Sequence, residues 1–148
     1  MMENANVNAE REPASNEKEK MRKNEAKQQA YRAGLEPPNN MGRMNDPDGS
    51  AWTKGQCGDT MEMYLVIKDD QITEARFHTD GCTASRACGS TAARLAESRT
   101  LKDVLRLSPA DVLDVWADLP QGNIHCAILA VGTLHKAVAD YLLRKQNG

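Results

Sequence analysis

The alternation of apolar and polar residues between positions 60 and 79 constrains the fold of this chain more than any other feature. From Thr60 to Lys68 every second residue is apolar, a period of two that predicts a half-buried β-strand. Asp69-Asp70-Gln71 predicts a turn and Ile72 to Thr79 the returning strand, which together form an antiparallel hairpin. Residues 51–56 could add a third strand. The side chains expected on the buried face are those of Met61, Met63, Leu65, Ile67, Ala75 and Phe77.

Beyond Cys82 the apolar residues recur with the helical period of 3.6. This pattern predicts helices over residues 83–97, 100–107 and 124–144, the last being the longest. Another helix is expected to start at Ser108-Pro109-Ala110-Asp111, because Ser caps helices and Pro suits their first turn. It carries Val112, Leu113, Val115 and Trp116. The buried stripe expected on the longest helix is Ile128, Leu129, Leu134, Val138, Tyr141 and Leu142.

Strands followed by helices predict an α+β fold, with a small antiparallel sheet of about three strands, helices packed on one face and a long C-terminal helix. Residues 1–35 are expected to form a polar N-terminal extension, disordered at first and then helical from 17 to 33. Asn16 and Glu19 would form the capping box of that helix and Gly34 its end. Residues 36–148 then form the folded domain.

The charge, the lengths of the apolar stretches and the cysteine content exclude several classes of function. The net charge of −2 gives no reason to expect nucleic acid as a partner. No apolar stretch reaches the length of a membrane span, and the N-terminus lacks the apolar core of a secretory signal, so we expect a cytoplasmic protein without a membrane partner. Thiols stay reduced in that compartment, which makes the four cysteines better candidates for metal binding or catalysis than for disulfides.

Three of the cysteines lie where predicted elements meet. Cys57 stands between Gln56 and Gly58 just before a strand, and Asp59 follows two residues later, on the same side of an extended chain. Cys82 immediately precedes a helix, and Cys126 lies in the first turn of the last helix. The unpaired N–H groups and partial positive charge of a helix N-terminus favour the thiolate, which is the form that binds metal or accepts sulfur.

These residues and the neighbouring His125 form the candidate metal site, which comprises Cys57, Asp59, Cys82, His125 and Cys126. Soft thiolates combined with one carboxylate or imidazole make a site whose cargo can be released, with Asp59 or His125 as the labile fourth ligand. Other interpretations remain open: Cys57 could be a buried apolar residue, Asp59 a turn residue and His125 a helix cap. Cys88 is expected in the core, and His78 and His135 at the surface or in packing contacts.

The same residues carry a resemblance to the NifU/IscU family of iron–sulfur cluster assembly scaffolds, running from about Pro37 to Tyr141. Three separated motifs in order carry it, together with Asn39-Asn40-Met41-Gly42 and Leu119-Pro120. These motifs are Gly55-Gln56-Cys57-Gly58-Asp59, Phe77-His78-Thr79-Asp80-Gly81-Cys82-Thr83-Ala84-Ser85 and His125-Cys126-Ala127-Ile128-Leu129-Ala130.

The resemblance implies a scaffold or carrier rather than an enzyme, a monomer or weak homodimer in which Cys57, Asp59, Cys82 and Cys126 hold the cluster. Such a protein accepts sulfur from a cysteine desulfurase, with Cys126 or Cys57 as the accepting thiolate, and binds iron. It builds a transient [2Fe–2S] cluster and passes it to apo iron–sulfur proteins, and zinc can occupy the same ligands. Pro120-Gln121-Gly122-Asn123 departs from the segment by which some members recruit an Hsp70-type chaperone, so dependence on a chaperone is in doubt.

Two other hypotheses remain. One is a zinc-dependent sulfur acceptor that activates a cysteine desulfurase, as in the SufU branch of the same superfamily, although residues 82–126 lack the insertion of that branch. The other is an interaction protein whose thiols are incidental or redox-sensing. The clustering of thiols beside Asp59 and His125 argues against it.

Overall fold

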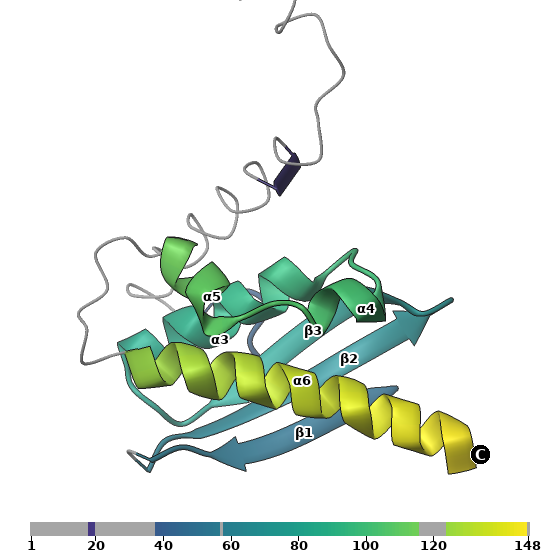
Figure 1. Ribbon diagram of the computed structural model, residues 1–148. Helices are drawn as coiled ribbons and strands as arrows, with labels where there is room; N and C mark the ends of the chain where they lie inside the picture. The colour runs from purple at the N-terminus through teal and green to yellow at the C-terminus, as the bar shows by residue number, and fades with distance from the viewer. Residues whose placement is uncertain (1–17, 20–37, 57, 116–123, 148) are drawn as a thin grey trace, which may run out of the picture.

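Three antiparallel strands form an open sheet in the order β1-β2-β3 (Figure 1). The computed structural model describes residues 18–19, 38–56, 58–115 and 124–147. The strands are β1 (Gly49–Lys54), β2 (Thr60–Lys68) and β3 (Gln71–Thr79). The predicted hairpin and third strand are therefore confirmed, and the third strand begins two residues before the predicted start. All six side chains expected on the buried face of the hairpin are at most 8% exposed.

A β-bulge in β3 puts two residues, Ile72 and Ala75, on the buried face that simple alternation would place on opposite faces. Ile67 pairs with Ile72 and Val66 with Glu74, which leaves Thr73 as the extra residue. The bulge reverses the pleat between Ile72 and Ala75, so both side chains are fully buried although they lie three positions apart. A period of two cannot show such a shift.

Within residues 38–147 the described helices lie on one side of this sheet, as predicted (Figure 1). They are α3 (Thr83–Ala96), α4 (Leu101–Val104), α5 (Pro109–Val115) and α6 (Ile124–Asn147), and α3 and α6 pack against the sheet directly. The short helix predicted over 100–107 is confined to α4, capped by the Thr100 hydroxyl, which accepts a hydrogen bond from the Asp103 N–H at 3.2 Å. At the start of α5 the Asp111 carboxylate accepts from the Ser108 N–H at 2.8 Å. Trp116 lies outside the described residues.

The buried stripe predicted for α6 is only partly right. Leu129, Leu134 and Val138 are buried and Tyr141 is half-buried, but Ile128 and Leu142 are 55% and 42% exposed. The helix lies so close to β1 that a Cβ atom added to Gly49 would be 2.4 Å from the Ala137 carbonyl oxygen. Small side chains therefore fill the contact between α6 and β1, and the larger side chains of Ile128 and Leu142 remain exposed to solvent. The buried small residues of α6 include Ala127, Ala130 and Ala137.

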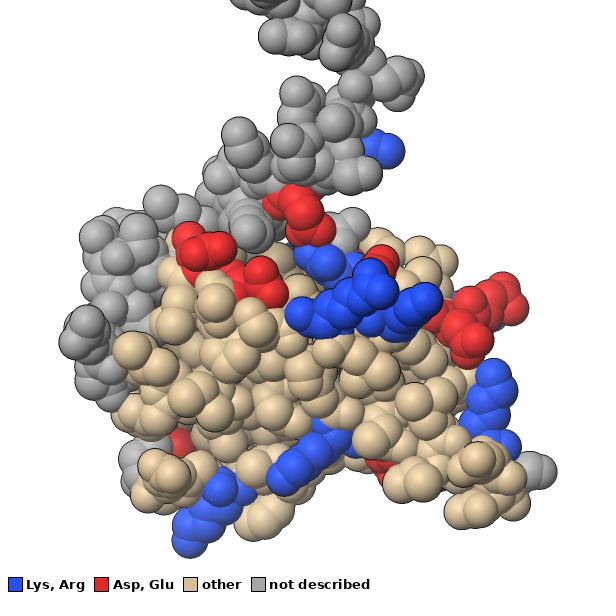
Figure 2. All heavy atoms as spheres, in the orientation of Figure 1, with Lys and Arg blue, Asp and Glu red and all other residues tan. Residues whose placement is uncertain are grey.

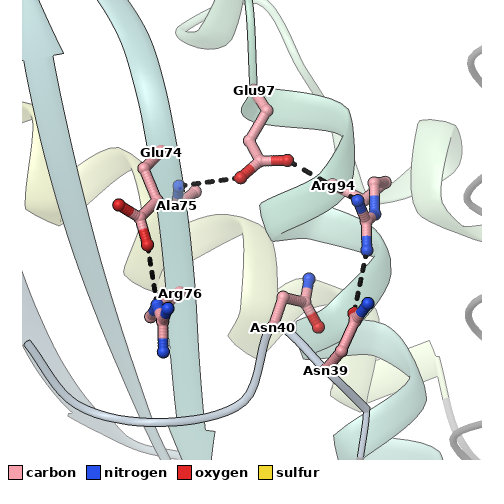
Figure 3. Close-up of a pocket in the computed structure, with 7 residues that line it drawn as sticks. All are labelled: Asn39, Asn40, Glu74, Ala75, Arg76, Arg94 and Glu97. Carbon is pink, nitrogen blue, oxygen red and sulfur yellow. Dashed lines mark hydrogen bonds and ion pairs between the residues drawn. The ribbon is translucent and has the colours of Figure 1, made fainter.

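The outer edge of β3 is covered along its length. The Ile72 N–H donates to the Arg99 carbonyl at 2.9 Å, and the Phe77 N–H donates to the Asn40 carbonyl at 3.2 Å. Between them the Glu97 carboxylate accepts from the Ala75 N–H at 3.2 Å, beside a polar pocket of about 180 Å³ (Figure 3). The outward N–H groups of β3 at these three positions are therefore all paired.

Of the predicted N-terminal helix, only Lys18 and Glu19 belong to the described residues, and both are helical. The Glu19 carboxylate accepts two hydrogen bonds from Arg99 Nη2, at 2.5 and 2.7 Å. The predicted boundary between residues 35 and 36 lies outside the described residues. Among the described helices, α6 has the length and mean hydropathy (1.4) of a membrane span, but half of that stretch is buried inside the protein, as in the core helix of a soluble domain.

Candidate metal centre

Three predicted ligands from distant parts of the chain meet at one end of the sheet. One ligand atom each of Asp59, Cys82 and Cys126 lies within 4.8 Å of the other two. Asp59 precedes β2, Cys82 caps the N-terminus of α3, and Cys126 is the third residue of α6. Two sulfur atoms and one carboxylate oxygen at this separation form an incomplete set of the donors that bind zinc or iron.

Cys82 is the exposed member of the group. The backbone N–H of Ser85 lowers the pKa of its thiol most, and the N–H of Ala84 adds to the effect, whereas partial burial and the Asp59 charge oppose it. The predicted effect of a helix N-terminus is thus confirmed for Cys82: it stands at the N-cap with extended backbone, so the open N–H groups of the first turn face its sulfur.

Ser85 joins all three ligand groups. Its buried hydroxyl donates a hydrogen bond to Asp59 Oδ2 at 2.6 Å. The Ser85 hydroxyl oxygen also lies 3.5 Å from Cys126 Sγ and 3.9 Å from Cys82 Sγ. A hydroxyl in this position fixes the direction of the carboxylate, and the second carboxylate oxygen keeps its capacity to bind a metal ion.

The chain beside the site is closely packed. A Cβ atom added to Gly81 would lie 2.6 Å from Asp59 Oδ2 and 2.7 Å from the Ser85 hydroxyl, so any other residue there would displace these two hydrogen-bonded side chains. Asp80 Oδ1 accepts from both the N–H and the hydroxyl of Thr60, at 2.9 and 2.7 Å, and the first of these bonds chiefly lowers the pKa of Asp80. These contacts fix the end of β3 against the start of β2, where Asp59 is located.

The remaining predicted site residues lie elsewhere or outside the described residues. Cys57 belongs to the undescribed part of the chain. His125 is half-buried, is not among the three converging ligands, and lines a groove between β1 and α6. Cys88 is fully buried, as predicted, and burial raises the pKa of its thiol to about 12.

The two other histidines make packing contacts, as predicted. His78 Nδ1 lies 3.7 Å from Glu62 on the sheet, and His135 Nε2 lies 3.0 Å from the Val104 carbonyl at the end of α4. Sequence reasoning missed Ser85, which it used only as part of a motif. One signal was available, because the third residue after an N-cap faces the same helix end as the cap.

Comparison with known proteins places this arrangement in a family. The model of the NifU-like N-terminal domain matches residues 27–147. The chain belongs to the NifU-like N-terminal domain family. It is 35% identical over 113 residues to the iron–sulfur cluster assembly scaffold protein IscU 1 of Archaeoglobus fulgidus, covering 75% of this chain and 72% of that protein. It is 31% identical over 111 residues to IscU of Aquifex aeolicus, covering 73% and 71%.

Solved structures of this family share the fold. The NifU-like N-terminal protein of Brucella abortus superposes with a TM-score of 0.56 at 17% identity, covering 78% of this chain and 99% of that one. A putative SufU scaffold of Fervidobacterium islandicum superposes with a TM-score of 0.54 at 16% identity, covering 68% and 87%. The three-stranded sheet with helices on one face is therefore the NifU-like fold.

Proposed function

We propose that this NifU-family chain is a scaffold on which a [2Fe–2S] cluster is assembled and from which it is passed to apo-proteins. The observation that carries the proposal is the convergence of Asp59, Cys82 and Cys126 within 4.8 Å. Cys57 is the proposed fourth member, on the basis of its place in the sequence two residues before Asp59. The names of the relatives, which are iron–sulfur cluster assembly scaffold proteins, support the same function. We further propose that residues 36–148 form the scaffold domain and that the protein works in the cytoplasm as a monomer or weak homodimer.

Sulfur enters, in this proposal, from the persulfide of a cysteine desulfurase. A thiolate of the scaffold attacks the outer sulfur, the S–S bond breaks, and the desulfurase thiolate leaves while a persulfide forms on the scaffold. The sequence suggested Cys126 or Cys57 as the acceptor. Cys126 is only 1% exposed, whereas Cys82 is exposed and its pKa is lowered, so Cys82 joins the candidates.

Asp59 rather than His125 is the proposed labile ligand. The Asp59 carboxylate lies with the two thiols, and one of its oxygens already accepts the Ser85 hydroxyl. A carboxylate is a harder and more readily exchanged ligand for iron than a thiolate, so the site retains a cluster less tightly than four thiolates would. His125 lines the adjacent groove, where it could contact a partner.

Zinc-dependent sulfur transfer is the second candidate. Two thiolates and a carboxylate also suit zinc, and the fold is shared with a putative SufU protein. In that scheme zinc is held by Cys57, Asp59, Cys82 and Cys126, and one thiolate leaves the metal to collect sulfur. The two functions differ in whether iron and sulfide accumulate on the protein.

Anaerobic reconstitution with iron, cysteine and a cysteine desulfurase distinguishes them. For a scaffold we expect thiolate-to-iron absorption in the visible range, with equal iron and sulfide, and loss of both in the Cys57→Ala and Cys82→Ala variants. Cys88→Ala is the matched control, because its buried thiol lies outside the three-ligand group. Tightly held zinc without a cluster, combined with faster desulfurase turnover, would instead support the sulfur acceptor.

A further inference from the structure

The two outer edges of the sheet differ. Loop backbone and the Glu97 carboxylate cover β3 (Figure 3), whereas β1 forms the opposite edge (Figure 1). Because the Gly55 N–H donates inward to the Asp59 carbonyl, the alternation of an antiparallel ladder directs the N–H and C=O groups of Ser50, Trp52 and Lys54 outward. The Ser50 N–H donates to Asp140 Oδ2 at 3.0 Å.

The outward backbone groups of Trp52 and Lys54 have no hydrogen-bond partner within the described residues. Two positions of open backbone at a sheet edge form a template for one additional strand. Natural proteins usually cover or charge such edges, as this chain does along β3.

A groove of about 310 Å³ runs beside this open edge, between the end of β1 and the first half of α6. Ile128 and Leu129 give it an apolar wall, and Ile128 is 55% exposed. Lys54, His125 and Lys136 also line it, and none of the nine lining residues is acidic. In Figure 2, basic side chains are separated by uncharged surface along the side of the molecule where β1 and α6 lie. The groove therefore suits apolar side chains next to carboxylates.

The opposite face of the same edge carries a large aromatic side chain. Trp52 is 60% exposed on the helix-free face of the sheet, where it pairs with Glu62 of β2. A strand added to β1 would place alternate side chains in the groove and over the indole ring, so its two faces would both find apolar surface.

We propose that the outer edge of β1 accepts an extended acidic–apolar segment of a partner protein as an additional strand. The open backbone at Trp52 and Lys54 supplies main-chain hydrogen bonds, and the basic, apolar groove selects the side chains. Gln56 and His125, which directly precede Cys57 and Cys126 in the sequence, line the groove, so a bound segment would lie beside the candidate metal centre. Its use in cluster delivery rests on the proposed function, but strand binding itself needs no cluster.

A second copy of this chain is a poorer occupant. Antiparallel pairing of two β1 strands about Trp52 would set Lys54 of one copy against Ser50 of the other. The Ser50 N–H is already bound by Asp140 in each copy. Each flanking pair would then lose one of its two hydrogen bonds, which weakens the pairing of two copies.

The test is titration of the metal-free full chain with an acetylated and amidated octapeptide of repeating Val-Val-Glu-Glu, which carries both residue types on each face of a strand, followed by ¹H–¹⁵N NMR. We expect saturable binding, with shifts at the Trp52 and Lys54 amides and near Ile128. A peptide of repeating Val-Val-Lys-Lys should bind at least about tenfold more weakly, because several exposed attractions become repulsions. Equal binding of the two peptides, or none at millimolar concentration, would overturn the proposal.

Matched variants locate the binding. Lys136→Glu should weaken the acidic peptide about three- to tenfold, as expected when one exposed attraction becomes a repulsion. Lys102→Glu carries the same charge change on α4, away from the groove, and should leave binding within about twofold. If both variants weakened binding equally, the overall charge of the protein would explain the effect, and binding of the peptide in the groove would be refuted.

Backbone methylation tests strand addition directly. Two versions of the peptide carry N-methyl groups on alternate amides, one on the odd positions and one on the even. Only one set of amides faces β1 in a paired strand, so one version should lose binding and the other keep it. Equal affinities would refute strand pairing. Shifts confined to α6 would indicate a small-ligand pocket, and concentration-dependent dimerisation through Trp52 without peptide would assign the edge to a second copy.

Discussion

Ser85 contacts all three residues that converge in the candidate metal centre. Its hydroxyl is within 3.9 Å of both thiols and donates to the carboxylate of Asp59, while its own N–H lowers the pKa of Cys82. A ligand carboxylate without such a partner would be free to rotate. Replacing a residue that orients a metal ligand therefore typically lowers metal affinity.

Replacing Ser85 with Ala should therefore lower zinc affinity by about 10- to 100-fold without unfolding the domain. Competition with a chromophoric chelator measures the affinity, and circular dichroism checks the fold. Thr83→Ala is the matched control, since it removes an exposed hydroxyl from the same helical turn. Similar affinities of the Ser85 and Thr83 variants would show that the hydroxyl does not orient Asp59.

Asp59→Ala tests the labile ligand. We expect a reconstituted cluster to persist several times longer in this variant, because the most exchangeable ligand is removed while the thiolates remain. The decay of visible absorption in the presence of a chelator gives the lifetime. Asp103→Ala, an exposed change on α4, should decay like the wild type. A shorter lifetime in the Asp59 variant would count against the assignment.

The thiols should differ in reactivity. At pH 8 a pKa of about 12 leaves roughly one Cys88 thiol in ten thousand ionised, and its burial blocks access as well. Cys82 is exposed and its pKa is lowered, so iodoacetamide should modify Cys82 first and Cys88 only after unfolding. Timed alkylation of the metal-free protein with peptide mass spectrometry measures the order. Early modification of Cys88 would contradict its placement in the core.

At the scale of elements, glycines set the distance between helices and sheet. A Cβ atom added to Gly89 of α3 would lie 2.6 Å from Cδ2 of Phe77 and 3.0 Å from Sδ of Met61. Among the described residues, no atom outside the local helix backbone lies within 4 Å of the Cβ position of Gly132 in α6. Gly89 therefore allows close packing of α3 on the sheet, whereas the Cβ position of Gly132 is open and a side chain would fit there.

Gly89→Ala should destabilise the protein by about 1–3 kcal/mol, the usual effect of overpacking a core. Gly132→Ala should stabilise it by about 0.5–1 kcal/mol, because alanine restricts the unfolded chain and favours the helix. Urea unfolding of both variants measures the difference. Equal changes in the free energy of unfolding would show that α3 does not pack against Phe77 this closely.

At the scale of the whole molecule, an ion pair connects the segment before β1 to the helix-free face of the sheet. Arg43 donates two hydrogen bonds to the Glu62 carboxylate, at 2.9 and 3.0 Å, and the Tyr64 hydroxyl donates a third. The Glu62 side chain is only 12% exposed. Its pKa is lowered, chiefly by the hydrogen bonds from Arg43.

This pairing makes stability depend on pH. Because the pKa of Glu62 is lower in the folded state, its contribution is present above the unfolded value of about 4.3 and is lost as pH falls through the folded value. Glu62→Gln should cost about 1–2 kcal/mol at pH 7, and the difference from wild type should shrink below about pH 4. Denaturant unfolding at pH 7 and pH 3 measures both values. A constant difference would show that the Glu62 charge does not contribute.

The sequence by itself determined most of the elements and identified the residues that converge in the candidate metal centre. Alternation fixed β2 and β3, the Ser108–Asp111 signal fixed the start of α5, and residues flanking predicted elements identified Asp59, Cys82 and Cys126. These inferences succeed because propensity, capping and burial pattern act over a few neighbouring residues. The buried interior of α6 was predicted less well, since Ile128 and Leu142 proved exposed.

Only the tertiary structure decided what depends on residues far apart in sequence. The close approach of Ala137 to Gly49 selected small residues for the contact of α6, and the bulge at Thr73 reversed the pleat of β3. The bond from Ser85 to Asp59 joins positions 26 residues apart. Packing distances and side-chain bonds of this kind arise when separate elements meet, and no local pattern records them.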